Sequence, residues 1–351
     1  MTKLFLYTAT FLFLIILLLV SIVMGIAIGS TYIHPSKVLS IIKYQLYNLV
    51  SKNRAHSTIE KDTSYVIVAQ IREPRTLAAV LGGAALSVAG LIYQVMFRNP
   101  IVGPYVLGVS SGASLAVGLV IMIGTYLGSK SVFASQTIVS AALLGAYAVT
   151  AVILLVAAVV RSVISLLLIG LMMGYLCNAA TSIMMTFAEK ERVHAYVMWT
   201  LGSFAGYKWG DVVLSAVTLI PMIVIAIATA RPLNLLLLGE DYAKTMGLNI
   251  KVFRIYAITV ASSLTAIVTA FAGPVGFIGV VVPHLARFVM RTNNNTILLP
   301  ATVLIGGIVT SICDVIARIM FAPIELPINA VTSLFGAPII IAFLLKRRVR
   351  T

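Results

Sequence analysis

Ionisable side chains inside apolar segments are the residues with the most potential for chemistry, and we expect only one acidic residue, Asp314, within a membrane span. Arg318 follows four residues later, which places the two side chains one helical turn apart. A local ion pair is therefore the expected role of Asp314. Ion-coupled carriers usually keep ionisable residues near the middle of the membrane, so this pattern does not favour such a carrier. If the chain takes part in transport, the energy is expected from outside it.

Other patterns that would indicate catalysis or metal binding are missing from the sequence. The glycine-containing stretch 124–131 lacks the Gly-Lys pair of a nucleotide-binding loop. The four histidines show no metal-ligand spacing, and the two cysteines fall within apolar segments. Paired catalytic carboxylates and a nucleophile elbow are not recognisable either. The sequence thus predicts neither an enzyme nor a metal site, and no cofactor is expected on this chain.

The composition is that of a polytopic membrane protein with an all-α fold. Of 351 residues, 60% are hydrophobic and 10% are charged, against roughly 25% charged residues in soluble domains. The apolar runs are about 20 residues long, which fits spanning helices rather than barrel strands. We expect one transmembrane domain, 1–351, with ten spans at about 4–28, 76–97, 102–127, 134–160, 163–187, 212–230, 255–272, 275–290, 297–316 and 328–345.

Ten spans place both termini on one side of the membrane, and the basic residues indicate which side. The terminal side carries thirteen Lys and Arg and the other side twelve, seven of which lie in the predicted outer loop 29–75. Without that loop the ratio is thirteen to five, which favours cytoplasmic termini in the cell membrane, while counting every loop leaves a weak signal. The net charge of +15 is scattered among membrane flanks, so a nucleic-acid partner is not predicted.

The polar stretch 231–254 is expected to hold a short capped helix between two spans. Gly239 and Gly247 bracket the helix, and glycine at its end takes a left-handed conformation at low cost. Acidic residues start the helix and Lys244 lies near its end, as the helix dipole favours. The stretch is either a surface for a soluble partner or an ordinary solvated loop, and the pattern alone leaves both open.

Several longer motifs resemble one family of membrane transport proteins. They are Arg72–Gly90 with Gln94 and Phe97–Pro100 after it, Leu107–Ala113, Gly273–Arg287 and Glu325–Pro338. In this order they are similar to the FecCD-type permeases, which belong to importers driven by ATP-binding cassettes for iron-siderophores, vitamin B12 and haem. The resemblance runs from about Arg72 to Lys346.

The resemblance implies a permease that forms a homodimer around a translocation path in the lipid bilayer. Two cytoplasmic ATP-binding subunits, which would bind ATP and Mg, would lie beneath it, and a substrate-binding protein would dock outside. It also implies an ATPase-coupling segment formed by Leu238, Gly239, Glu240, Asp241, Tyr242, Ala243, Lys244, Met246 and Gly247. Acidic residues of the binding protein would meet Arg72, Arg75 and Arg318, all of which fall on the predicted outer side.

The path in such permeases is lined from the fifth span, which here gives Asn178, Thr181 and Ser182 as polar candidates, although a Met-rich helix is more often ordinary core. Two positions depart from the family pattern. Glu73-Pro74 stands where Leu-Pro is common, which puts an acid between the docking arginines, and Asn329 stands where Gly is common.

The sequence thus favours an importer permease for a metal chelate, with molybdate or tungstate as the alternative cargo within the same architecture. An ion-gradient-driven secondary transporter is a less favoured alternative, because buried carboxylates are nearly lacking. An intramembrane enzyme would need a catalytic dyad on facing spans, and none is recognisable.

Overall fold

A computed structural model describes residues 2–29, 31, 33–50, 62–123, 135–160 and 162–348, and these contain helices but no strand. The α-helices are α1 (Thr2–Ala27), α2 (Pro35–Val50), α3 (Thr63–Val66), α4 (Glu73–Met96), α5 (Val109–Ile123), α6 (Ser135–Val159), α7 (Val163–Phe187), α8 (Lys190–Thr200), α9 (Trp209–Ala228), α10 (Ala230–Leu238), α11 (Glu240–Thr245), α12 (Ile250–Ala272), α13 (Ile278–Met290), α14 (Asn295–Ile319) and α15 (Ile328–Arg348). A π-helical segment, η2 (Ile67–Arg72), joins α3 to α4, and a 3-10 turn, η3 (Pro104–Leu107), precedes α5.

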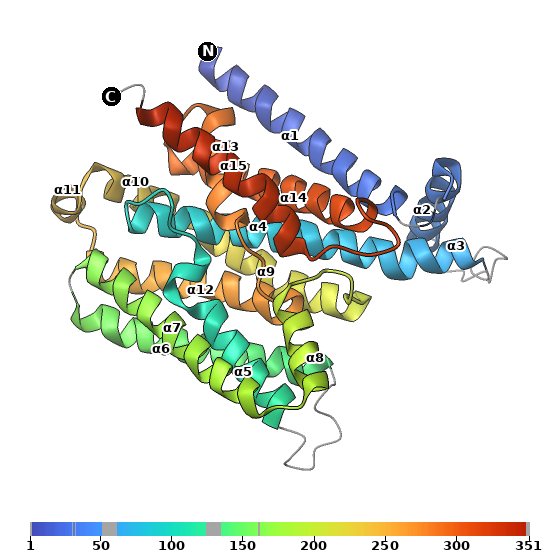
Figure 1. Cartoon of the computed structure of the whole chain (residues 1–351). Helices are drawn as coiled ribbons and strands as arrows, with labels where there is room; N and C mark the ends of the chain where they lie inside the picture. The colour runs from blue at the N-terminus through green and yellow to red at the C-terminus, as the bar shows by residue number, and fades with distance from the viewer. Residues whose placement is uncertain are drawn as a thin grey trace.

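In the part of the chain that the structure describes, ten apolar helices follow the order of the ten predicted spans. Within the described residues, seven are long and apolar enough to cross a membrane: α1, the continuous α3–α4 rod, α6, α7, α9, α12 and α14. Three shorter apolar helices, α5, α13 and α15, complete the set. In Figure 1 the start of α1, the end of α15 and α11 lie at one end of the bundle, and α2 and α3 lie at the other. The all-α, multi-span architecture is therefore confirmed.

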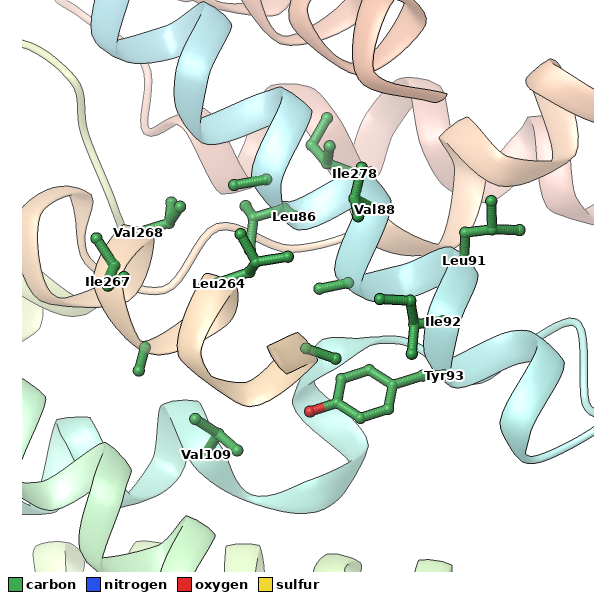
Figure 2. Close-up of a cluster of buried hydrophobic side chains, with 14 of the residues drawn as sticks. Leu86, Val88, Leu91, Ile92, Tyr93, Val109, Leu264, Ile267, Val268 and Ile278 are labelled. Atoms are coloured by element: carbon green, nitrogen blue, oxygen red, sulfur yellow. The ribbon is translucent and has the colours of Figure 1, made fainter. Parts of the chain in front are cut away.

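The core forms where α4 packs between α12, α13 and α14. Figure 2 shows side chains of α4, including Leu86 and Tyr93, meeting Leu264 of α12 and Ile278 of α13, with Val109 of α5 below them. The Tyr93 hydroxyl lies 2.7 Å from the Ser262 hydroxyl, so this buried polar group has a partner. By contrast, α1, α6, α7 and α9 each leave large apolar side chains exposed, as expected for helices that face lipid or another subunit.

Small residues allow the core helices to approach closely. A Cβ atom at Gly306 of α14 would come within 2.6 Å of the Gly83 carbonyl oxygen of α4. At Gly90 a Cβ atom would overlap the backbone of Gly279 in α13. The glycine-rich run in the predicted second span therefore serves helix packing, which is the usual role of small residues between membrane helices.

The segment 29–75, predicted as an outer loop, is helical over much of the part that the structure describes. Helix α2 packs through Val38 and Ile41 against Ile26 of α1 and Val68 of η2. The second span begins at Thr63 rather than near Thr76. The sequence reasoning missed both, because it gave the polar residues of the segment more weight than the apolar period of α2.

Pro74 does not interrupt the rod formed by α3, η2 and α4. Proline in a helix clashes with the carbonyl group four residues earlier. Here the wider π-helical turn of η2 precedes it, and the helix continues without a break. At the beginning of this rod, Asp62 caps α3 by accepting a hydrogen bond of 3.0 Å from Ser64 N. Lys37 Nζ lies 2.6 Å from the same carboxylate and holds the pKa of Asp62 below its usual value.

Candidate functional site

Arg75, Arg318 and Asp314 form a buried charge cluster, as Arg75 of α4 meets the other two on α14. Arg75 Nε donates to Asp314 Oδ1 at 3.0 Å. Arg318 Nη2 lies 2.9 Å from Asp314 Oδ2, so the predicted ion pair one turn apart is confirmed. The side chains of Arg75, Asp314 and Arg318 are only 5%, 2% and 5% exposed. Two guanidinium groups therefore share one buried carboxylate.

Glu325 completes this cluster from the loop after α14. Arg75 Nη1 donates to both carboxylate oxygens of Glu325 at 2.9 Å. Unlike the other members, Glu325 is 42% exposed on its side chain. The sequence reasoning did not pick out Glu325 as a partner of Arg75, since 250 positions separate the two residues and no local spacing relates them.

Arg72, the third predicted docking residue, is also buried but has different partners. Its guanidinium donates to the carbonyl oxygen of Ala27 at 2.8 Å and to Thr31 Oγ1 at 3.1 Å, beyond the end of α1. Arg72, Arg75 and Arg318 therefore lie buried in one region, where α1, α4 and α14 come together, rather than on an open surface. Arg318 Nη1 also points to the Ile28 carbonyl oxygen, at 3.4 Å.

Glu73 lies between two of these arginines in the sequence but is turned towards α2. Its carboxylate accepts a hydrogen bond of 2.9 Å from Gln45 Nε2. Glu73 is itself buried, and it lies in α4, within the second span. The prediction that Asp314 is the only acidic residue within a span is therefore wrong. Glu73 was expected just before the second span, but that span begins at Thr63 and therefore includes Glu73.

Helix α11 has the predicted position and caps. Gly239 and Gly247 flank it with φ of +126° and +85°, where other residues would be strained. Ala243 is fully buried, whereas Leu238, Tyr242 and Met246 are 66%, 48% and 59% exposed. The helix is therefore anchored on one side and presents apolar side chains on the other. Glu240 and Asp241 lie in its first turn, as the sequence indicated.

One ion pair connects this helix to α12, and a second lies within the helix itself. Arg254 Nη2 of α12 lies 3.2 Å from Glu240 Oε1, and Lys244 Nζ lies 3.1 Å from Asp241 Oδ1 within the helix. Glu240, Lys244 and Arg254 also line a cavity of about 430 Å³ between α11, α12 and the end of α6. Charged side chains therefore line a cavity next to the exposed apolar side chains of this region.

The three polar candidates on α7 do not share one environment. Asn178 and Ser182 are exposed, and the Ser182 hydroxyl donates to the Asn178 carbonyl at 2.9 Å. Thr181 is buried and donates to the Cys177 carbonyl at 2.9 Å. Tyr175 and Met172 are 61% and 53% exposed on the same helix as the first two residues. Only Asn178 and Ser182 are thus placed where they could line a passage.

Asn329, the second departure from the family pattern, stabilises a turn between helices. Its Nδ2 donates to the Pro274 carbonyl at 2.6 Å, and its Oδ1 accepts from Gly276 N. The side chain joins the start of α15 to the segment between α12 and α13. The substitution therefore supplies hydrogen bonds to this turn rather than disrupting it.

Comparison with known proteins extends these observations over nearly the whole chain. The FecCD transport family matches residues 17–346. The hemin transport system permease protein HmuU of Yersinia pestis is 32% identical over 293 residues, which are 83% of this chain and 87% of that protein. The vitamin B12 import system permease protein BtuC of Klebsiella pneumoniae is 33% identical over 337 residues, 96% and 93% of the two chains.

A solved structure has a similar fold over nearly the whole length of both chains. It is an inward-facing conformation of a metal-chelate type ABC transporter, and it is 28% identical to this chain with a TM-score of 0.81. The match covers 97% of this chain and 99% of that one. The helical bundle and the family match define a multi-pass membrane permease of the ABC importer type, which is not itself an enzyme. More specifically, the chain belongs to the FecCD transport family.

Proposed function

We propose that this chain is the permease subunit of an importer that moves a metal chelate, such as a ferric siderophore, cobalamin or haem. The observation that carries this proposal is the similarity to haem and vitamin B12 permeases over more than four fifths of the chain. ATP and Mg would be bound by two separate cytoplasmic subunits, and a binding protein outside the membrane would deliver the cargo. Both termini and α11 would then face the cytoplasm.

Helix α11 is the proposed contact with the ATP-binding subunits. Leu238, Tyr242 and Met246 offer an exposed apolar surface at the end of the bundle that also holds the start of α1 and the end of α15. The buried Ala243 and the Glu240–Arg254 ion pair connect the helix to α12. Movement of the ATP-binding subunits would therefore be passed to a spanning helix, and the two access states would change population.

The opposite end of the molecule is the proposed docking region for the binding protein. Arg72, Arg75 and Arg318 lie there together, and electrostatic contact with acidic side chains would orient the partner and speed its association. A second copy of the chain would cover the exposed face of α7. Asn178 and Ser182 would then line the translocation path, with Thr181 inside the protein behind them.

Uptake into proteoliposomes tests this function. The vesicles would hold this chain with its candidate ATP-binding subunit, and the candidate binding protein would be added outside with ferric siderophore, cobalamin, haem or molybdate. We expect ATP-dependent uptake of one of the three chelates. ATP-dependent uptake of molybdate alone would instead support the oxyanion alternative. Uptake by this chain alone, insensitive to ATP and abolished by ionophores, would show a gradient-driven carrier and contradict the proposal.

The docking assignment has its own test. The triple variant Arg72→Gln, Arg75→Gln, Arg318→Gln should lose binding of the binding protein while the assembled complex keeps its basal ATPase activity. Retained ATPase activity would show that the variant has folded and assembled. Undiminished binding by such an active complex would remove the docking role of the three arginines.

A further inference from the structure

Arg75 is the one arginine of the buried cluster whose guanidinium reaches both an inner and an outer carboxylate. Its Nε donates to Asp314, which is 2% exposed on its side chain, and its Nη1 donates to Glu325, which is 42% exposed. Glu325 therefore lies between Arg75 and the solvent. Of the two carboxylates on Arg75, Glu325 is thus the one that solvent reaches.

The loop that carries Glu325 has a separate attachment to α14. Leu326 N donates to the Ala317 carbonyl at 2.9 Å, so the backbone next to Glu325 is held without the ion pair. The preceding residues Phe321 and Ile324 are 59% and 71% exposed. The Glu325 side chain can consequently leave Arg75 while the base of the loop stays attached, provided that another anion takes its place on Arg75.

Glu325 supplies the second negative charge of the cluster, which also holds Arg75, Arg318 and Asp314. Without Glu325, Arg75 and Arg318 would have the single carboxylate of Asp314 between them. Two largely buried cations with one buried anion leave a positive charge that favours another carboxylate, because an uncompensated buried charge is costly. The site that Glu325 occupies on Arg75 is thus suited to a carboxylate from another molecule.

We propose that Glu325 occupies the docking site internally, and that a carboxylate of the binding protein replaces it on Arg75 Nη1 when the two proteins meet. This inference rests on the docking role proposed above. It adds the prediction that docking is an exchange of one carboxylate for another, with release of the Glu325 side chain. Wild-type affinity is accordingly lower than the arginines alone would give.

The variant Glu325→Gln tests the exchange, with Glu189→Gln as its matched control. Glu189 is also an exposed carboxylate paired with an arginine, Arg192, at 2.9 Å, and it lies between α7 and α8, outside the cluster that holds Glu325. Each variant, in nanodiscs, would be titrated with the candidate binding protein. We expect Glu325→Gln to bind about tenfold more tightly than wild type, and Glu189→Gln to bind as wild type. Equal affinity in all three proteins would overturn the exchange, and absence of binding in all three would instead count against the proposed docking function.

A measurement that leaves Glu325 intact guards against a folding defect in the variant. A spin label on Ile324→Cys would report the mobility of the loop, since the native Cys177 and Cys313 are buried. Saturating binding protein should make this label more mobile as Glu325 is released. A label that becomes less mobile or stays unchanged, although the binding protein is bound, would contradict the exchange.

Discussion

At the scale of single residues, Asp314 compensates the positive charge of the buried arginine cluster. It is the buried anion that contacts both Arg75 and Arg318. Removing one member of a buried charge group costs more than the group contributes, because the remaining charges lose their compensation.

We therefore expect Asp314→Asn to lower the free energy of unfolding by about 3–5 kcal/mol. Thermal unfolding of the detergent-purified protein would measure the effect. Glu189→Gln, which breaks a pair whose carboxylate side chain is 56% exposed, should change stability by no more than about 1 kcal/mol. Equal melting temperatures for the two variants would show that Asp314 does not hold the cluster together.

Local spacing predicted only part of this cluster. The pair of Asp314 and Arg318 follows from a separation of four residues in a helix. The contacts from Arg75 to Asp314 and Glu325 join positions 239 and 250 residues apart, and they exist only because α4 packs on α14. The sequence could identify the arginines through a family resemblance, but their burial and their internal partners required the packed structure.

At the scale of the helices, the spans and α11 were predictable because apolar length and flanking glycines are local signals. The start of the second span was not, because η2 allows the helix to pass Pro74. The sequence also did not distinguish the exposed from the buried path candidates on α7. Asn178 and Ser182 lie one turn apart on an exposed face, whereas Thr181 lies on the buried face.

Close approach of α4 and α13 yields a prediction at this scale. A methyl group at Gly90 would overlap the Gly279 backbone, so Gly90→Ala should lower the free energy of unfolding by about 1–3 kcal/mol. At Gly210 of α9 an added Cβ would have no atom within 4 Å, so Gly210→Ala is the control and should not destabilise the protein. Denaturant or thermal unfolding of both variants would show whether this helix contact is as tight as described.

Helix α11 gives a second prediction. Tyr242→Ala combined with Met246→Ala removes most of its exposed apolar surface without touching the buried Ala243. ATP-driven uptake should fall at least tenfold, corresponding to about 1.4 kcal/mol of lost contact energy, while the melting temperature of the permease alone stays unchanged. Thr245→Ala on the same helix removes only a local hydrogen bond to the Tyr242 carbonyl and should transport normally. Normal transport by the double variant would exclude this surface as the ATPase contact.

At the scale of the whole molecule, the exposed helices must face either lipid, a second copy or a water-filled path. Cysteine substitution distinguishes these surroundings. In vesicles, Asn178→Cys and Ser182→Cys should react with a water-soluble thiol reagent, because both would line the path. Leu144→Cys on α6, where leucine is 71% exposed, should stay unreactive if that face meets lipid. Protection of Asn178→Cys and Ser182→Cys together with Leu144→Cys would place the α7 residues in lipid or in a dry contact.

Helix α4 is buried along nearly all of its length, and this has a consequence for how the sequence can change over evolution. From Ala78 to Met96 only Val80 and Leu81 have more than slight exposure, whereas most of α1 is exposed. Exposed apolar positions can exchange among Leu, Ile, Val and Phe with little effect, but enclosed positions must keep size as well as polarity. In a library of random variants, transport should therefore survive many different substitutions in α1 but few in α4. Of the two helices, α4 would then change more slowly in evolution.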